Sequence, residues 1–333
     1  MKAERVVFRN FLKVEVEAFE LDDANLGPYD VITKTRKTVI SPGTELARLQ
    51  SKLYFETDIP PGFPINEVGY ANIGTVLAAG DRVAVKPGDR VFTMGNHSSI
   101  SRVNSQTMLC VPVPDGLSDE DAAFARIATV SMTTMVNTIA RAGDSVGIVG
   151  LGLVGNLAAQ VFQAAGMVVN GFDLTPHRRD LAQACGVRSV HGAEGMANFQ
   201  QAHRLVIEAS GVARAVAAAV EMTAPGGEIV MIGAPWGGDA NSIPSSQLTR
   251  LIFFRFLRLR SGSEWEIPRQ PEPLALGSNY QNTVTALRWL QDGRLNVQPL
   301  ITHRITPSQT PDAYDGLLNR PNDYLGVVID WTA

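Results

Sequence analysis

Alternating apolar and polar residues dominate roughly the first hundred positions of the chain. Alternation of this kind is typical of half-buried strands, and it predicts strands over residues 14–19, 30–40, 71–79, 90–92 and 107–113. Turn-forming residues separate them at 41–43, 60–62 and 86–89. We therefore expect a small, mostly antiparallel barrel or sandwich here.

The pattern changes after residue 116. Ser118, followed by three acidic residues, predicts the start of a helix that runs to about residue 142. Strand-like and helical segments then alternate, with strands expected over 145–150, 168–172, 205–208 and 228–233 and helices over 155–165, 178–185 and 213–222. This alternation predicts a parallel, doubly wound sheet.

The last sixty or so residues combine one amphipathic helix, expected over 282–292, with strand-like pieces that end at residues 325–330. Their strand character is similar to that of the N-terminal part. The sequence thus predicts an α/β protein of two domains, since 333 residues exceed the usual size of a single hydrophobic core. We expect one domain over residues 1–115 and 274–333 and the other over 116–273.

Charge and composition exclude several classes of function. The formal net charge of −4 gives no general attraction to nucleic acid. No apolar signal-peptide region follows the N-terminus, and the apolar stretches are too short or too broken by glycine to cross a bilayer. The two cysteines, Cys110 and Cys185, cannot build a disulfide framework or a cysteine-rich metal site. We expect a cytoplasmic protein without nucleic-acid or membrane partners.

Three glycines mark a candidate dinucleotide site. Gly150, Gly152 and Gly155 follow an expected strand and open an expected helix, whose first turn contains Leu153 and Val154. In such a motif the first glycine permits the turn, the second lets backbone N–H groups approach a pyrophosphate, and the third lets helix and strand pack closely. The spacing therefore predicts a Rossmann-type nucleotide site.

Asp173 follows the next expected strand. A carboxylate there binds the hydroxyls of the adenosine ribose and repels a 2′-phosphate, which favours NAD over NADP. Arg178 and Arg179 follow closely, and an arginine could receive that phosphate, so NADP stays open as an alternative.

Taken together, these motifs make the whole chain similar to the medium-chain dehydrogenase/reductase superfamily, which includes alcohol and polyol dehydrogenases and quinone reductases. The resemblance rests on the order and spacing of segments 41–46, 69–76, 85–91, 150–155, 206–211, 225–233 and 299–304. It implies a GroES-like β-rich catalytic domain beside the Rossmann domain, and a homodimer or homotetramer formed through the Rossmann domains. The segments 41–46 and 69–70 look most like the branch that includes bacteriochlorophyllide a dehydrogenase.

That branch implies hydride transfer between NAD(P)(H) and a secondary alcohol or ketone of a polar, cyclic biosynthetic substrate. The usual ligands of a catalytic zinc are altered, because Pro42 stands in the cysteine position and Tyr70 in the histidine position. We therefore expect no bound metal.

Without a metal, another group must polarise the substrate oxygen and move its proton. The resemblance places Tyr70 and Thr44 beside the nicotinamide, and they are the leading candidates; Tyr70 could equally fill the vacated metal space. Glu45 and the loop residue His97 are weaker catalytic candidates. The other four histidines are expected to be solvated or to cap helices.

Further residues should line the cofactor crevice, because ligands bind at the carboxyl ends of parallel strands. They are Thr129, Ser210, Gly211, Gly233 and Trp236, of which Trp236 could instead be a wedge between domains.

Two other functions stay open for a small-molecule protein of this kind. An enoyl or quinone reductase also needs no metal, and a non-catalytic protein could bind the dinucleotide without turning anything over. Turnover of ketones, of enones, or of neither would separate the three hypotheses.

Overall fold

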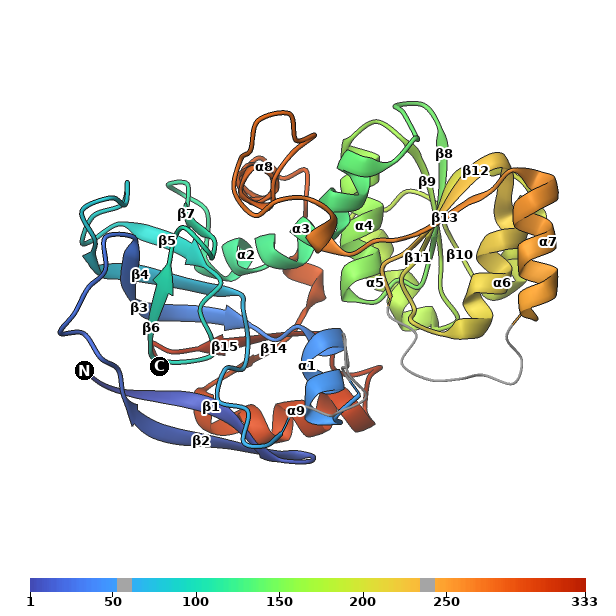
Figure 1. Ribbon diagram of the computed structural model, residues 1–333. Coiled ribbons are helices and arrows are strands. Elements are labelled where there is room, and N and C mark those ends of the chain that lie inside the picture. The colour runs from blue at the N-terminus through green and yellow to red at the C-terminus, as the bar shows by residue number, and fades with distance from the viewer. Residues whose placement is uncertain (53–61, 234–242) are drawn as a thin grey trace.

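The computed structural model describes residues 1–52, 62–233 and 243–333. The described residues form two large sheets that lie at opposite ends of the molecule, joined by helices (Figure 1). None of the helices in these ranges is long and apolar enough to cross a membrane.

The first sheet contains the N-terminal strands and the last two strands of the chain. Its order is β14-β15-β3-β4-β5-β7, and β6 pairs with β3. The strands are β3 (Asp30–Val39), β4 (Asn72–Ala79), β5 (Arg90–Thr93), β6 (Ile100–Asn104), β7 (Cys110–Pro112), β14 (Ile301–Ile305) and β15 (Gly326–Asp330). All pairs except β14 with β15 are antiparallel, as expected for this half. The C-terminal segment therefore does return to the N-terminal sheet.

The sequence pattern missed several elements beside this sheet. Strands β1 (Lys2–Asn10) and β2 (Lys13–Glu20) form a hairpin, of which only the second strand was expected, over residues 14–19. Helix α9 (Thr310–Asn319) lies where strand-like pieces were predicted. Residues 41–43, expected as a turn, begin helix α1 (Pro42–Leu49) instead. A proline is well tolerated in the first turn of a helix, because the N–H that it lacks has no intrahelical partner there.

The second sheet is the expected parallel, doubly wound sheet. Its order is β10-β9-β8-β11-β12-β13, and every neighbouring pair is parallel. The strands are β8 (Ser145–Val149), β9 (Val168–Phe172), β10 (Val190–His191), β11 (His203–Glu208), β12 (Thr223–Met231) and β13 (Arg258–Ser261). Around them lie α4 (Leu153–Ala164), α5 (Pro176–Ala184), the 3-10 helix η1 (Ala193–Phe199), α6 (Ala213–Met222) and α7 (Ser245–Arg255).

The single long helix expected from Ser118 is two helices, α2 (Asp119–Ala123) and α3 (Ala125–Asn137), which meet at Phe124. Ser118 caps the first as expected, and its hydroxyl accepts from the Asp121 N–H at 3.0 Å. The short 3-10 helices η2 (Glu264–Glu266), η3 (Gln298–Leu300) and η4 (Pro307–Gln309) and helix α8 (Asn279–Gln291) complete the fold.

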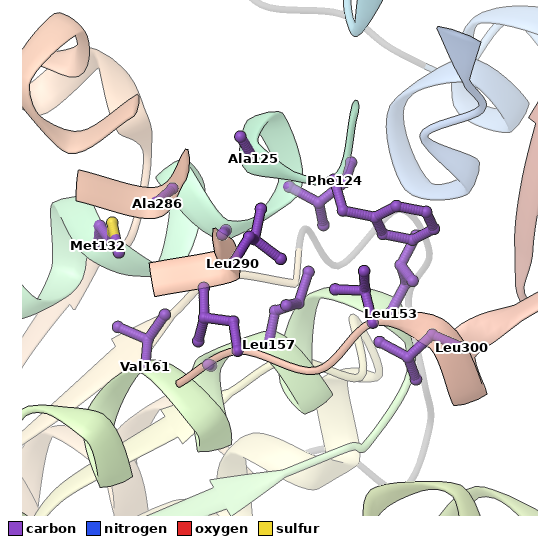
Figure 2. Packing of buried hydrophobic residues seen from close by; sticks show 14 of the residues in the cluster. Phe124, Ala125, Met132, Leu153, Leu157, Val161, Ala286, Leu290 and Leu300 are labelled. Atoms are coloured by element: carbon purple, nitrogen blue, oxygen red, sulfur yellow. The ribbon is translucent and has the colours of Figure 1, made fainter. Parts of the chain in front are cut away.

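One apolar core joins the two sheets through these helices. Figure 2 shows Phe124 and Met132 from the α2–α3 region, Leu157 from α4 and Leu290 from α8 packed together, all buried. Burial of such side chains contributes roughly 1.5–3 kcal/mol each. The α/β fold with a Rossmann sheet is confirmed, whereas the domain boundaries at residues 115 and 274 stay predictions.

Candidate active site

A pocket among the described residues has a volume of about 490 Å³ and is lined from both halves of the molecule. One side, which we call the glycine wall, consists of Gly152, Leu153 and Val154 with Ala209, Ser210, Gly211 and Gly233. The other, the hydroxyl wall, consists of Ser41, Pro42, Gly43, Thr44 and Tyr70. Residues far apart in the sequence therefore share one cavity.

The three glycines of the turn between β8 and α4 have different reasons to be glycine. Gly150 has φ +93°, and a Cβ there would lie 2.8 Å from the Ser210 nitrogen. A Cβ on Gly155 would lie 1.8 Å from the Gly150 carbonyl oxygen. At Gly152, in contrast, the nearest atom to an added Cβ is a guanidinium nitrogen of Arg178, at 3.9 Å. Packing therefore requires the first and third glycines but leaves room at the second, which lines the pocket.

The strand end at β11 completes the glycine wall. Glu208 turns its buried carboxyl group toward the next turn and accepts from the Ser210 N–H at 2.7 Å and from the Gly211 N–H at 3.3 Å. Burial raises the pKa of Glu208, and these hydrogen bonds act against the rise. The carboxyl group thus fixes the turn that carries Ser210 and Gly211.

Asp173 and Arg178 lie where the sequence places a ribose site, but in different surroundings. The Asp173 carboxylate is buried and accepts from the N–H groups of Leu151 and Thr175, both at 2.8 Å. Arg178 lines the pocket, and one of its nitrogens lies 4.0 Å from that carboxylate. Arg179 donates to the carbonyl groups of Asp173 and Leu174 at 2.8 and 3.0 Å, so its side chain binds the backbone that follows β9.

Helix α1 positions the hydroxyl wall. Its Pro42 and Thr44 line the pocket together with Ser41, the residue that precedes the helix. The Tyr70 hydroxyl donates to the Ser41 hydroxyl oxygen at 2.5 Å. Burial raises the pKa of Tyr70, and the Ser41 and Thr44 hydroxyls act against that rise. Two of the expected catalytic residues, Tyr70 and Thr44, are therefore brought together in the pocket.

Glu45 and His97 meet, but they are not among the pocket-lining residues. Both are fully buried, and the His97 Nε2 lies 3.1 Å from a Glu45 carboxylate oxygen. The same oxygen accepts from the Tyr314 hydroxyl of α9, and the other accepts from the Ser41 N–H at 2.8 Å. His97 is therefore an interior residue. Its ring packs against Gly69, and a Cβ added to Gly69 would lie 2.6 Å from the ring.

Four expected cofactor residues are not among the pocket-lining residues, namely Gly150, Gly155, Asp173 and Thr129. Thr129 is fully buried in α3, where its hydroxyl donates to the Ala125 carbonyl at 2.7 Å and lies 3.3 Å from that of Thr283. Trp236 lies outside the described residues. The expectation that the histidines other than His97 are solvated or capping is wrong for His203, which is buried beside Phe199 and hydrogen-bonded to Ser145 at 2.7 Å.

The sequence reasoning also missed Ser41 and Tyr324, which line the pocket. Ser41 immediately precedes Pro42, and a serine before an N-terminal proline is a helix-start signal that could have identified it. Tyr324 follows α9, a helix that was not expected, so no signal indicated its position.

A catalytic zinc does not fit the side chains present here. Pro42 has no donor atom, and the Tyr70 hydroxyl is engaged with Ser41. Within residues 1–52, 62–233 and 243–333, no group of three or more His, Cys, Asp or Glu side chains is placed to hold a metal ion. A catalytic zinc needs three such protein ligands.

Comparison with known proteins relates this geometry to a family. Residues 154–264 match the family model described as zinc-binding dehydrogenase, a segment that includes neither Pro42 nor Tyr70. The chain is 26% identical over 330 residues to 2-desacetyl-2-hydroxyethyl bacteriochlorophyllide A dehydrogenase of Cereibacter sphaeroides, covering 92% of each chain. It is 28% identical over 280 residues to D-guloside 3-dehydrogenase of Shigella flexneri, covering 77% of this chain and 75% of the relative.

Solved structures share the fold over nearly the whole length. An alcohol dehydrogenase of Escherichia coli CFT073 complexed with NADH has a TM-score of 0.80 at 15% identity, over 99% of both chains. A dehydrogenase of Sinorhizobium meliloti 1021 bound to NADP has a TM-score of 0.78 at 19% identity, also over 99% of both chains. The family-model match and these relatives support the medium-chain dehydrogenase/reductase superfamily, and the protein is an oxidoreductase.

Proposed function

We propose that the protein transfers a hydride between a nicotinamide dinucleotide and a secondary alcohol or ketone, with Tyr70 as the acid/base group. The observation that carries this proposal is the shared pocket, which is lined both by Gly152 of the glycine turn and by Tyr70 and Ser41, whose hydroxyls are hydrogen-bonded to each other. The substrate class, a polar cyclic alcohol, is supported by the names of the bacteriochlorophyllide and D-guloside relatives.

The glycine wall fits the diphosphate of the cofactor. Helix α4 begins at Leu153 after Gly152, its N-cap residue makes no side-chain hydrogen bond to the first turn, and Gly152, Leu153 and Val154 line the pocket. A helix N-terminus with free N–H groups favours an anion. The room above Gly152 is consistent with a ligand at that position, because the protein's own packing does not require a glycine there.

We propose that NAD is preferred over NADP. The Asp173 carboxylate would repel a 2′-phosphate, and a ribose hydroxyl could replace one of its backbone donors. Arg178 is the residue that opposes this preference, since it lines the pocket 4.0 Å from that carboxylate.

Bound nicotinamide would supply the hydride acceptor or donor. In ketone reduction, the Tyr70 hydroxyl gives its proton to the carbonyl oxygen as that oxygen gains charge, and the Ser41 hydroxyl hydrogen-bonds to the phenolate that results. In alcohol oxidation the phenolate takes the proton of the substrate hydroxyl. Because burial raises the pKa of Tyr70, its phenolate is scarce near neutral pH, and oxidation should speed up toward alkaline pH.

Thr44 lies in the same wall and could donate to the substrate oxygen, which makes it the second catalytic candidate. Glu45 and His97 act, in this proposal, as positioning residues. Glu45 accepts from the Ser41 backbone and from Tyr314, and so it ties the start of α1 to α9. His97 contacts the same carboxylate oxygen as Tyr314.

We further propose a cytoplasmic homodimer or homotetramer that associates through the Rossmann half. Strand β13 lies at an edge of its sheet, and Phe253, Phe254 and Phe256 beside it are 74%, 68% and 77% exposed. Light scattering during size exclusion would test this, and a monomer at micromolar concentration would contradict it.

The test of the function is a substrate panel assayed by NADH absorbance. Cyclic ketones and polyols should be turned over, and Tyr70→Phe should abolish most of that turnover. Reduction of enones alone would replace the proposal with the enoyl reductase hypothesis. Tight NADH binding without turnover of either class would instead indicate a non-catalytic protein.

A further inference from the structure

Arg126 is a buried cation in a helix that is otherwise uncharged. It lies in the first turn of α3, is 2% exposed, and is the only charged residue between Asp121 and Arg141. Burying an unpaired guanidinium is costly, so a residue of this kind needs a partner. Glu264 of η2 is that partner, and its two carboxylate oxygens accept from both terminal nitrogens of Arg126.

The ion pair leaves part of the guanidinium unmatched. Among the described residues, the Arg126 Nε has no hydrogen-bond partner although it is buried. The Arg126 Cζ lies 4.7 Å from the centroid of the Tyr70 ring. Arg126 thus contacts a carboxylate on one side and the aromatic ring of Tyr70, a pocket-lining residue, on the other.

A cation over an aromatic face is attracted by the negative charge of that face. The attraction is stronger when the hydroxyl is ionised, because a phenolate spreads its charge into the ring. Electrostatic interactions of this kind are also stronger in a buried site than in water. Arg126 therefore favours the phenolate form of Tyr70 over the phenol.

We propose that Arg126 is a positioning residue for the reaction, stabilising the Tyr70 phenolate that forms when the phenol gives its proton to the substrate oxygen. This inference rests on the proposed acid/base role of Tyr70. It explains how a site whose described residues do not fit zinc could still favour proton transfer to that oxygen, because the negative charge left on Tyr70 is stabilised.

The groups around Tyr70 act in opposite directions. Burial is the largest influence and raises the pKa of Tyr70; Arg126 lowers it, and the carboxylate of Glu45 on α1 raises it. Glu264 on η2 partly neutralises Arg126. Farther away, His97 and Tyr314 contact Glu45 rather than Tyr70.

The simpler explanation is that Arg126 and Glu264 only join α3 to η2. The two explanations differ in one observable, the ionisation of Tyr70 in the protein without cofactor or substrate. Replacing both partners, as Arg126→Met with Glu264→Gln, removes the charges without leaving either one unpaired. Glu264→Gln alone leaves the charge of Arg126 unopposed.

The ionisation can be followed by ¹⁹F NMR on protein labelled with 3-fluorotyrosine, which ionises at lower pH than tyrosine. The chain has six tyrosines, and Tyr70→Phe identifies the resonance of Tyr70. The double variant should raise the pKa of this group by about one unit or more, a tenfold change in its ionisation constant. Glu264→Gln should lower the pKa, and Arg126→Lys should give a smaller rise than the double variant.

The pH profile of kcat/KM should move in the same direction as the resonance for each variant. A folded double variant with an unchanged Tyr70 titration would overturn the inference. If the double variant does not fold, an unchanged titration in both Arg126→Lys and Glu264→Gln overturns it equally. Full activity of Tyr70→Phe would remove the proposed function instead, and it would leave the titration result unaffected.

Discussion

The glycine wall and the hydroxyl wall line the same pocket, yet the chain encodes them differently. Much of the glycine wall comes from one turn, in which Gly150 and Gly155 are required by close backbone contacts. The hydroxyl wall joins Ser41 to Tyr70, two residues from separate segments, through a side-chain hydrogen bond. The first wall is therefore fixed by backbone geometry and the second by side-chain chemistry, and substitutions should affect them differently.

The largest expected effect is on folding, at Gly155. In Gly155→Ala the new methyl group would collide with the Gly150 carbonyl, and overpacking of this kind costs about 3 kcal/mol or more. We expect insoluble protein or a fall in Tm of roughly 5 °C or more in calorimetry. Gly152→Ala is the matched control, since its methyl group has room. It should keep the wild-type Tm but lose cofactor affinity; equal behaviour of the two variants would contradict this account of the glycine wall.

The hydroxyl wall should respond in rate rather than in stability. Tyr70→Phe removes the proton donor and should lower kcat about 10²–10⁴-fold. The dissociation constant of NADH should stay within about twofold, because Tyr70 belongs to the other wall. Steady-state kinetics and fluorescence titration measure the two quantities. Ser41→Ala should have a smaller effect on kcat, and a wild-type rate in Tyr70→Phe would show that the acid/base group lies elsewhere.

Cofactor choice should depend on Asp173, which follows β9 of the Rossmann sheet. Asp173→Ser removes the charge that opposes a 2′-phosphate, and the ratio of kcat/KM for NADPH to that for NADH should rise about tenfold. Arg178→Ala should lower the same ratio, because the guanidinium that lines the pocket is then absent. Kinetics with both reduced nucleotides provide the measurement. A ratio that moves the same way in both variants would refute the opposed roles.

The part of the molecule built on the Rossmann sheet should also lose stability as the pH falls, through His203. Burial lowers the pKa of His203 to about 4, and the neighbouring His191 contributes. In the unfolded chain this imidazole takes up a proton near pH 6.5. Between these two values the unfolded state binds more protons, so the stability contributed by His203 is present above about pH 6.5 and is lost as the pH falls toward 4.

The loss should amount to roughly 2–3 kcal/mol, measured by urea unfolding at several pH values. His203→Phe should flatten the dependence by about one proton. His177→Gln, at an exposed position, is the control and should leave the slope as it is. An unchanged slope in His203→Phe would contradict the assignment.

Most of the fold and the glycine wall could be predicted from sequence, because the signals are local. The glycine spacing, the alternation of strands and helices, and the Ser118 cap each depend on neighbouring residues. Helix α9 could not be predicted from its pattern. The start of α1 was predicted as a turn, because Pro42 and Gly43 are residue types that also form turns.

The hydroxyl wall was only half predictable. Tyr70 and Thr44 were expected through family resemblance, whereas the contact of Arg126 with Tyr70 joins two segments whose proximity exists only in the folded chain. A lone charge in an otherwise uncharged helix was the available signal for Arg126. The burial of His97 follows from its contact with Gly69, which no local pattern reveals.

The central claim is that the pocket between the two sheets binds a nicotinamide dinucleotide through the glycine wall. Isothermal titration of the wild-type chain with NADH tests it most directly, with Gly152→Ala as the control. The account predicts one site per chain with a dissociation constant in the micromolar range, on the order of 1–100 μM, and at least tenfold weaker binding in the variant. No detectable binding of NADH or NADPH by the folded wild-type protein at about 1 mM would contradict it.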